Sequence, residues 1–488
     1  MAAMAMQYLK ESQKTTPIIA DVDVAVVGGG AAGFVAAIAA AREGASTVLI
    51  ERFGTLGGCM GTGGWAAGAV YFSDFDRTRF PPHTYYGWSG ASRQLGQENI
   101  DFIRTCGITG EWIARVLDLD KQFGPSPHRV ASSMRVSHVC SQMVQEAGID
   151  LMLSTYAGDP IMEDEHIVRG LTVHNTDGRG AIRAGVTIDT TGNSGFAART
   201  YAPLMQCNWQ PSMNITFIIA GCDDAKFAAF MANRPTVPNH WNQWIDEVLI
   251  PDATYTQGRL GAHLNRMRPV ADLVRQAREE DGYEIIGHIG NIGRIAVVFP
   301  WGSKCPQNGL FCERADIEGK IDTLDAEHMS LVEYHARQYM TQTTGFLRKY
   351  VPGFENAYLL YTSPYIGTRG GRAIEAERVI TEEDRDEGRR FDDVIYEFGE
   401  GLTEPSDVPF RQLIPKRVEN LLAAGVSAHR KPPNLRCRES VMKMGHAAGI
   451  TAAMSVHAGV APRKIDVHQL QQKLIDSGVN LGDARHAT

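Results

Sequence analysis

The feature that most constrains the fold is the stretch VDVAVVGGGAAGFVAAIAAAREGASTVLIE at residues 22–51. An apolar β-branched run precedes a glycine-rich turn, an alanine-rich stretch and a second apolar run. This order predicts strand, helix and strand of a dinucleotide-binding unit. Gly28, Gly30 and Gly33 have the spacing GxGxxG: the first permits the tight turn, the second lets a pyrophosphate approach the backbone, and the third lets the helix lie close to the strand. We therefore predict an α/β fold with a Rossmann-like domain.

An acidic residue closes the second predicted strand. Glu51 follows Gly33 by eighteen residues (51 − 33), where a carboxylate accepts hydrogen bonds from both ribose hydroxyls of an adenosine. It would repel a 2′-phosphate, so NADP is disfavoured at this site. The predicted cofactor-binding residues of this unit also include Ala31, Ala32 and Arg52.

A second glycine-rich passage follows at once. Residues 51–64, ERFGTLGGCMGTGG, contain six glycines. Such a passage suits backbone amides held close to a ligand that continues beyond the pyrophosphate, and FAD is such a ligand. Gly57, Gly58 and Cys59 are therefore predicted to contact the cofactor.

Cys59 has alternative interpretations. A small packed side chain is favoured over a thiol that is covalently attached to the flavin or redox-active, so non-covalent FAD is expected. The sequence contains no CxxC pair, which excludes a disulfide mechanism of the CxxC type.

Composition narrows the class of protein. The chain has 488 residues, which predicts at least two domains, and its net charge of −8 does not favour a nucleic-acid partner. No apolar run reaches the ~18–20 residues of a membrane-spanning helix. The irregular cysteine spacing and the lack of a secretory signal favour a cytoplasmic protein. His328 and His335 are interpreted as surface-helix residues, so no metal site is predicted, and the oligomeric state stays open.

Four sequence blocks resemble one family. They are VAVVGGGAAG…VLIERFGTLGG, VTIDTTGNSGFAA at 186–198, YVPGFENAYLLYTSPYIGTRGGRAI at 350–374, and LIPKRVENLLAAGVSA…LRCRESVMKMGHAAGITAA at 413–453. The chain resembles the FAD-dependent oxidoreductases of the glutathione-reductase-type fold, near the succinate dehydrogenase and fumarate reductase flavoproteins. It departs from the usual pattern of that branch at Cys59, Arg438 and Lys443.

The resemblance implies further cofactor contacts. The strand through Ala157 would pass the adenine, and Thr191 and Gly192 would meet phosphate or ribose. The strand that ends at Gly425 and the helix that begins near Ser440 and Val441 would hold the flavin ring, with Ser440 as the expected N-cap. A helix N-terminus aimed at the ring favours the negative charge of the reduced flavin.

The flavin domain is therefore expected to be discontinuous, with an inserted α+β substrate or cap domain. The expected divisions are a tail at 1–18, the FAD-binding domain at 19–60, 130–200 and 413–470, the cap domain at 61–129 and 201–412, and a C-terminal tail at 471–488. A small-molecule substrate would bind between the two domains.

Substrate-side candidates come from the basic and aromatic segments. His429 is the first candidate for a general base and Tyr365 the second, whereas Arg369 and Arg438 are candidates for binding an anionic group. Eight aromatic residues in 65–88 suggest either packing or an apolar pocket, and the run TEEDRDEGRRFDD at 381–393 is interpreted as a solvated loop. The favoured function is hydride transfer between a small organic substrate and flavin. The alternatives are a flavin-dependent monooxygenase and a protein in which FAD is structural.

Overall fold

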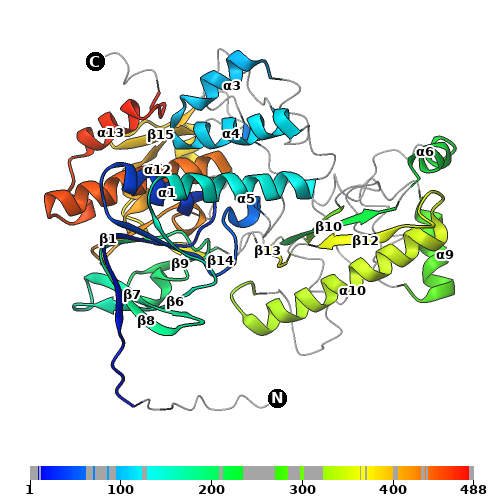
Figure 1. Ribbon diagram of the computed structural model, residues 1–488, viewed down its shortest axis with the longest axis horizontal. Coiled ribbons are helices and arrows are strands. Elements are labelled where there is room, and N and C mark those ends of the chain that lie inside the picture. Colours follow the sequence, from blue (N-terminus) through cyan, green and yellow to red (C-terminus); the bar gives the residue numbers. More distant parts are fainter. Residues whose placement is uncertain are drawn as a thin grey trace.

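The chain forms two lobes in the computed structural model (Figure 1). The structure describes residues 9, 12–61, 70–71, 85–86, 95–123, 129–207, 213–221, 223–234, 270–283, 297–301, 322–362, 364–368, 371–398, 405–429, 435 and 438–482. One lobe holds a large mixed sheet, and the other holds a smaller antiparallel sheet. The predicted α/β class is confirmed.

The main sheet has the strand order β5-β2-β1-β8-β7-β6, and β17 also pairs with β8. Its strands are β1 Ile18–Val27, β2 Thr47–Ile50, β5 Asp150–Met152, β6 Tyr156–Met162, β7 Val168–Asn175, β8 Gly178–Asp189 and β17 Leu421–Ala423. The pairs β1–β2, β2–β5, β1–β8 and β17–β8 are parallel. The apolar run at the end of β1 is fully buried, as expected of a central parallel strand.

Strand β8 serves two pairings. The first half of β8 forms an antiparallel hairpin with β7, and the pair that closes this hairpin is Asn175 and Gly178. The second half of β8 lies parallel to β1 and β17. The sequence of residues 170–192 predicts this hairpin with its turn at Asp177-Gly178, and the observed turn, Thr176-Asp177, lies one residue earlier. Because β1, β2, β8 and β17 are parallel, their carboxyl ends meet at one edge of the sheet, the usual location of a ligand in such folds.

Helices cover this sheet. They are α1 Ala31–Arg42, α3 Gln97–Arg104, α4 Gly107–Phe123, α5 Arg129–Glu146, α12 Arg438–Ala458 and α13 Val467–Asp476. α12 lies directly on α1 (Figure 1). The contact depends on small residues: a Cβ added at Gly445 or Gly449 would lie 2.2 Å from the carbonyl oxygen of Ala32 or Ala36, respectively. This close approach fixes α12 relative to the glycine-rich turn that begins α1.

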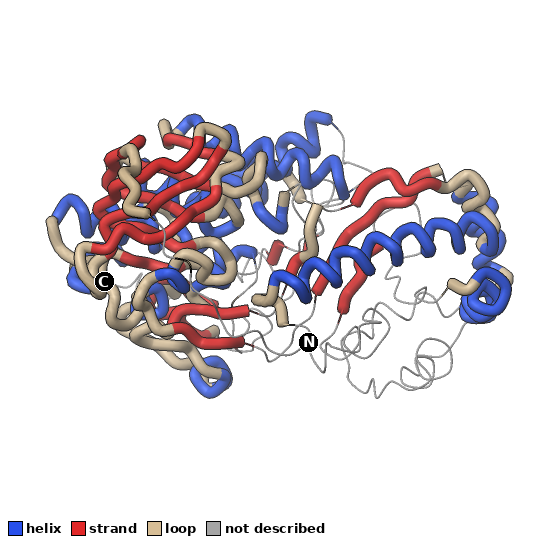
Figure 2. The backbone as a smooth tube through the Cα atoms, turned by 90° about the horizontal axis from the view of Figure 1, so that it is seen from below, coloured by secondary structure: helices blue, strands red, loops and turns tan. Residues whose placement is uncertain are grey.

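The second lobe is built on a small antiparallel sheet. It contains β10 Met213–Ala220, β11 Val297–Trp301, β12 Tyr358–Thr362, β13 Gly367–Thr368, α6 Asp224–Ala232, α9 Ala271–Asp281 and α10 Ala326–Tyr350. Figure 2 shows α10 lying along this sheet. Asp325 caps α10 by accepting hydrogen bonds from the amides of Glu327 and His328.

Short elements complete the described structure. They are β3 Val70–Tyr71, β4 Tyr85–Tyr86, β9 Leu204–Cys207, β14 Gly371–Ile374, α11 Glu382–Asp386, β15 Val394–Phe398, β16 Ser406–Pro409, and the 3₁₀ turns Gly58–Met60, Ala197–Arg199, Phe410–Leu413, Gly425–Ser427 and Pro462–Lys464. Most of the aromatic-rich segment 65–88 lies outside the described residues.

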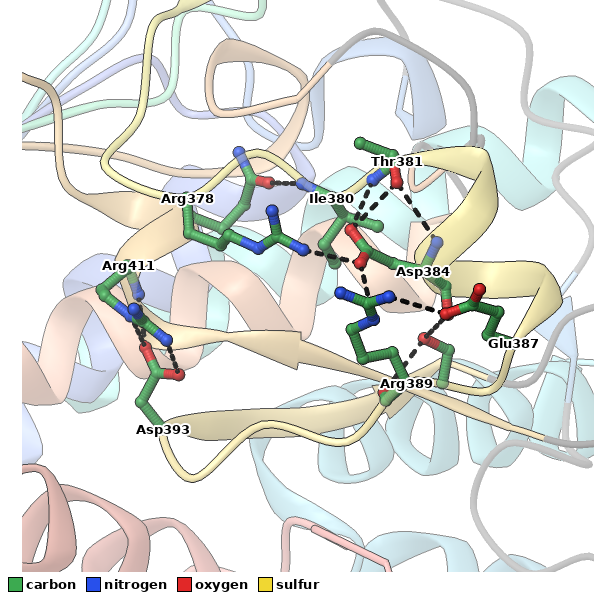
Figure 3. Close-up of polar contacts among 10 residues, drawn as sticks. Arg378, Ile380, Thr381, Asp384, Glu387, Arg389, Asp393 and Arg411 are labelled. Atoms are coloured by element: carbon green, nitrogen blue, oxygen red, sulfur yellow. Dashed lines mark hydrogen bonds and ion pairs between the residues drawn. The ribbon is translucent and has the colours of Figure 1, made fainter.

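The interpretation of the charged run 381–393 as a solvated loop was wrong in part, because the run contains the helix α11 and two buried acids although most of its charged side chains are exposed. Asp384 is 1% exposed, forms a capping box with Thr381 at the start of α11, accepts a hydrogen bond of 2.6 Å from Arg378, and forms an ion pair with Arg389 at 3.1 Å (Figure 3). Asp393 accepts two hydrogen bonds from the guanidinium of Arg411. Charge-assisted pairs therefore order this segment.

The C-terminal residues also pack. α13 extends to Asp476, and Leu474, Val479 and Leu481 are buried, so residues 471–482 belong to the first lobe instead of forming a tail. Among the described helices, none is long and apolar enough to cross a membrane.

Candidate functional site

The GxGxxG turn lies at the carboxyl edge of the sheet, between β1 and α1. Gly28 has φ +104°, and a Cβ there would lie 2.7 Å from the carbonyl oxygen of Thr190. A Cβ at Gly33 would lie 1.7 Å from the carbonyl oxygen of Gly28, so both positions require glycine for the fold. Gly30 differs, because a Cβ there would meet no heavy atom of the described residues within 4 Å. The open side of the turn therefore faces the N-terminus of α1, which favours an anion.

Glu51 is buried at the end of β2 and reaches back to this turn. Its Oε2 accepts a hydrogen bond of 2.6 Å from the amide of Gly29, and its Oε1 accepts one of 2.9 Å from the amide of Phe53. Burial raises the pKa of Glu51 above its usual value, although these two amides oppose the rise. Each carboxylate oxygen has a second lone pair, so the group can still accept from ribose hydroxyls.

The second glycine-rich passage lies against the first. The amide of Gly57 donates to the carbonyl oxygen of Gly29 at 2.9 Å, and a Cβ at Gly58 would lie 3.0 Å from Cα of Gly30. Gly57 and Gly58 have φ of +96° and +51°, a conformation that glycine adopts without strain. Cys59 follows with an exposed side chain. The favoured interpretation of a packed cysteine is therefore wrong for this residue.

The loop after β8 closes the other side of the turn. Buried Asp189 accepts hydrogen bonds from the amide and hydroxyl of Thr191 and from the hydroxyl of Ser427. Ser427 in turn accepts from the amide of Gly192 at 3.0 Å. The sequence analysis did not single out Asp189 or Ser427. Asp189 carries a local signal, since an acid at a strand end commonly accepts from amides that follow it.

Three predicted cofactor residues meet beside α1. A Cβ added at Gly425 would lie 3.0 Å from Cβ of Ala32 and 3.4 Å from Cβ of Val441. Gly425 has φ +66° and begins the 3₁₀ turn that precedes α12. Ser440 is not the N-cap that the sequence predicted, because α12 already begins at Arg438. Its side chain is buried inside the first turn.

Ala157 lies apart from this cluster, on β6. Its carbonyl oxygen accepts a hydrogen bond from Arg199, as does that of Gly158 at 2.9 Å. Arg199 thereby ties β6 to the loop after β8.

Tyr365 lies beside the turn that carries Glu51. Its ring stacks on Phe53 with centroids 4.6 Å apart and an interplanar angle of 2°, and the guanidinium of Arg52 lies 4.6 Å from the Phe53 centroid. Burial raises the pKa of Tyr365 well above its usual value, and the neighbouring Cys59 and Glu51 add to the rise. The phenol therefore stays protonated near neutral pH and donates a proton poorly to any base.

The remaining catalytic candidates are only partly described. His429 follows the 3₁₀ turn Gly425–Ser427, is 0% exposed, and donates its amide to the carbonyl oxygen of Gly425 at 3.2 Å. Arg438 begins α12, and Arg369 lies outside the described residues. The structure thus places His429 in the segment before α12 and Arg438 in the first turn of α12, and it places Tyr365 at the Glu51 end.

The residues present fit a long dinucleotide. Gly30 and the α1 N-terminus offer room and donors for a pyrophosphate, Glu51 offers acceptors for a ribose, and the passage through Gly57 and Gly58 continues past the turn. Fold and site together define a dinucleotide-binding α/β protein whose cofactor extends beyond the pyrophosphate.

The chain belongs to the FAD dependent oxidoreductase family, whose model matches residues 23–474. It is an oxidoreductase and its cofactor is FAD. A comparison with curated proteins found no match.

Solved structures give only distant likenesses. A geranylgeranyl bacteriochlorophyll reductase-like protein from Thermoplasma acidophilum is 14% identical, with 94% of this chain and 84% of that chain covered and a TM-score of 0.40. A flavin-dependent brominase is 13% identical, with 93% and 83% covered and a TM-score of 0.40. The p-nitrophenol 4-monooxygenase from Pseudomonas putida DLL-E4 is 12% identical, with 94% and 84% covered and a TM-score of 0.37. Likenesses at this level carry nothing about the reaction of this chain.

Proposed function

We propose that this protein transfers a hydride between a small organic substrate and FAD. One observation carries the proposal: the passage through Gly57 and Gly58 is bonded onto the GxGxxG turn, which extends the dinucleotide site in the direction of an isoalloxazine ring. When bound, FAD supplies a ring that accepts a hydride from a substrate carbon.

Different residues of the chain are proposed to bind different parts of FAD. Glu51 is proposed to hold the adenosine ribose, Gly30 and the α1 N-terminus to hold the pyrophosphate, and Thr191 and Gly192 to line the same end. Gly425 and the first turn of α12 are proposed to support the ring. The positive end of α12 would stabilise negative charge there.

The substrate side is proposed to lie under the second lobe. The strands β10 to β13 with α6, α9 and α10, which fall within the expected cap division 201–412, would cover the ring, and residues 19–60, 130–200 and 413–470 would hold it. His429 is proposed to take a proton from the substrate. Its complete burial supports a site closed to water.

Arg438 and Arg369 are proposed to orient an anionic group on the substrate. Within the family, the four sequence blocks support a place near the succinate dehydrogenase and fumarate reductase flavoproteins. A cation pair that positions substrate is consistent with a small carboxylate or phenolate.

Anaerobic reduction of the bound flavin tests the proposal. The purified protein is mixed with carboxylates, phenols, alcohols and amines in turn, and loss of the oxidised flavin absorbance is recorded. Reduction by one class, with stoichiometric product, is the expected result. Reduction by NADPH alone, with oxygen then inserted into a substrate, would instead establish a monooxygenase. Failure of every donor in a protein that retains FAD would make the flavin structural.

A further inference from the structure

A row of buried polar side chains follows one face of α12. Glu439, Lys443 and His446 lie at intervals of four and three residues and are 3%, 5% and 3% exposed. Nζ of Lys443 is 2.9 Å from Oε1 of Glu439. Removing such groups from water is costly, and a purely apolar packing of this face would serve stability at least as well. The row therefore calls for a role other than stability.

A small cavity separates Lys443 from His446. Its volume is about 10 Å³, and its walls include both side chains together with Thr109 of α4 and Asn480. Such a volume admits about one water molecule. Oγ1 of Thr109 is buried and has no hydrogen-bond partner among the described residues. A water in the cavity would satisfy this hydroxyl, because buried polar atoms are almost always hydrogen-bonded.

His446 connects this cavity to a larger cleft. Its Nε2 lies 3.3 Å from Oγ of Ser477, and that hydroxyl already donates to the carbonyl oxygen of Leu474 at 2.8 Å. Ser477 must therefore accept from Nε2–H, which leaves Nδ1 as an acceptor beside Gly107. His446 and Ser477 both line a cleft of about 200 Å³.

The cleft reaches the surface through charged residues of several helices. Its lining includes Arg42 and Glu43 at the end of α1, Arg104 of α3 and Glu111 of α4. The Arg42 and Arg104 side chains are 44% and 38% exposed. Arg42 is paired with Glu111 at 2.8 Å, so the rim carries both signs of charge next to His446. At the inner end, the Lys443 ammonium lies 5.8 Å from the ring centroid of Tyr396, and Cys106 lines the small cavity.

We propose that Glu439, Lys443, His446 and Ser477, with one water molecule in the cavity, form a proton path from the first turn of α12 to the cleft beside Arg42. The inference rests on the proposed function, which sets that first turn against the flavin. The path would carry away a proton released beside the first turn of α12, whether a substrate loses it as its hydride leaves or the reduced flavin loses it on oxidation.

The transfer balances at every group. Glu439 takes a proton at the inner end and passes one to Lys443, which passes one to the water. The water gives one to Nδ1 of His446, and Nε2 gives one through Ser477 to solvent in the cleft. Each group gains one proton and loses one, only O–H and N–H bonds break and form, and no electron moves along the path. A neutral imidazole suits this step, because it accepts at one nitrogen and donates from the other.

Proton release during flavin oxidation tests the path. The FAD-loaded protein is reduced with dithionite, freed of excess reductant, and mixed anaerobically with ferricyanide in weak buffer containing a pH indicator. Two ferricyanide ions take the two electrons of each flavin, and its proton enters the solution. The flavin absorbance and the indicator are followed together. Because ferricyanide replaces the organic substrate, this experiment tests the proton path separately from the proposed function. The path can fail while a substrate still reduces the flavin, and the path can hold while no substrate reduces it.

His446→Gln is the principal variant and His457→Gln its control, since His457 is exposed on the same helix. In the wild type and the control, proton release should keep pace with oxidation. In His446→Gln it should lag by ~10-fold or more, because an amide cannot relay a proton. Proton release should also lag behind oxidation in Thr109→Val, because this variant lacks the hydroxyl that holds the water.

Chemical rescue separates a relay from a structural role. In His446→Ala, added imidazole can enter through the cleft and should restore the rate of proton release. If proton release keeps pace with flavin oxidation in both His446→Gln and Thr109→Val, the path is overturned. Failure of imidazole to restore His446→Ala overturns it as well. If His446→Gln does not fold, wild-type timing in Thr109→Val alone suffices to reject the proposal.

Discussion

The amide nitrogen of Gly57 lies 2.9 Å from the carbonyl oxygen of Gly29, so two glycine-rich passages are joined edge to edge. The first belongs to the turn between β1 and α1, and the second follows β2. Their close approach depends on glycine, since a Cβ at Gly29 would lie 2.4 Å from the Leu56 side chain and a Cβ at Gly58 would lie 3.0 Å from Cα of Gly30. A single glycine motif accounts for binding a pyrophosphate, whereas the joined pair accounts for a cofactor that continues past it.

The glycines of the GxGxxG turn are predicted to have separable roles. Gly30→Ala should fold normally, because its Cβ meets no described atom within 4 Å, yet it should weaken FAD binding by roughly 1–3 kcal/mol by crowding the pyrophosphate. Gly33→Ala should instead destabilise the fold by ~3 kcal/mol or more, because its Cβ would lie 1.7 Å from a carbonyl oxygen. Thermal melting and FAD titration measure the two effects. Wild-type FAD affinity in Gly30→Ala would mean that the pyrophosphate does not bind next to Gly30.

Glu51 is predicted to contribute directly to FAD affinity. Glu51→Ala removes charge-assisted hydrogen bonds to the ribose and should weaken binding by roughly 1–3 kcal/mol. Glu43→Ala is a matched control, since Glu43 forms a partly exposed ion pair with Lys473 that is worth little. Denaturation of the wild type should release FAD. Titration of FAD into the three apoproteins then measures the three affinities. Equal affinity in all three would remove Glu51 from the site.

The flavin is predicted to be bound without a covalent link. The passage around Cys59 is expected to hold the cofactor through backbone amides, so a covalent bond from its exposed thiol is not needed for binding. Acid precipitation should leave a colourless pellet and yellow supernatant. Flavin that stays in the pellet of the wild type but not in that of Cys59→Ser would show that the thiol is attached to the ring.

Local signals predicted the parts of the structure that depend on neighbours in sequence. The order β1-α1-β2 follows from apolar runs around a glycine turn, and the β7-β8 hairpin follows from alternation and a turn. Long-range partners were not predictable. Ser427 bonds to Asp189 across 238 positions of the chain. Asp384 is buried because Arg378 and Arg389 converge on it, which a run of alternating charges does not reveal.

Two site positions depend on packing between distant segments. Ser440 has the chemistry of a helix cap, but helix α12 starts two residues earlier because its buried face is set by contact with α1. Tyr365 was the second candidate for a general base, and its ring stacks on Phe53, which comes from a distant segment of the chain. Tertiary packing, not local propensity, decides both positions.

His429 is predicted to act in substrate oxidation. His429→Gln should retain FAD and fold, and should slow flavin reduction by the substrate by ~10²–10⁴-fold, the usual effect of losing a general base. Reduction by dithionite, which needs no base, should be unchanged.

Arg438→Ala should chiefly raise KM, because Arg438 is proposed to position an anionic group of the substrate. Stopped-flow absorbance distinguishes these variants, and a wild-type substrate rate in His429→Gln would assign the histidine to packing.

His446 is predicted to make stability depend on pH. Burial, and then the charge of Arg42, lowers the pKa of His446 from 6.5 to about 4 in the folded protein. Below pH 6.5 the unfolded chain therefore binds a proton that the folded protein does not bind until the pH approaches 4. Stability is fully present above 6.5 and is lost as the pH falls through this window, by about 3 kcal/mol in total. Urea unfolding across the window should show a shallower pH dependence in His446→Gln than in wild type or His457→Gln. Parallel curves for all three proteins would mean that His446 is protonated as readily in the folded chain as in the unfolded one, and would contradict its burial as a neutral imidazole.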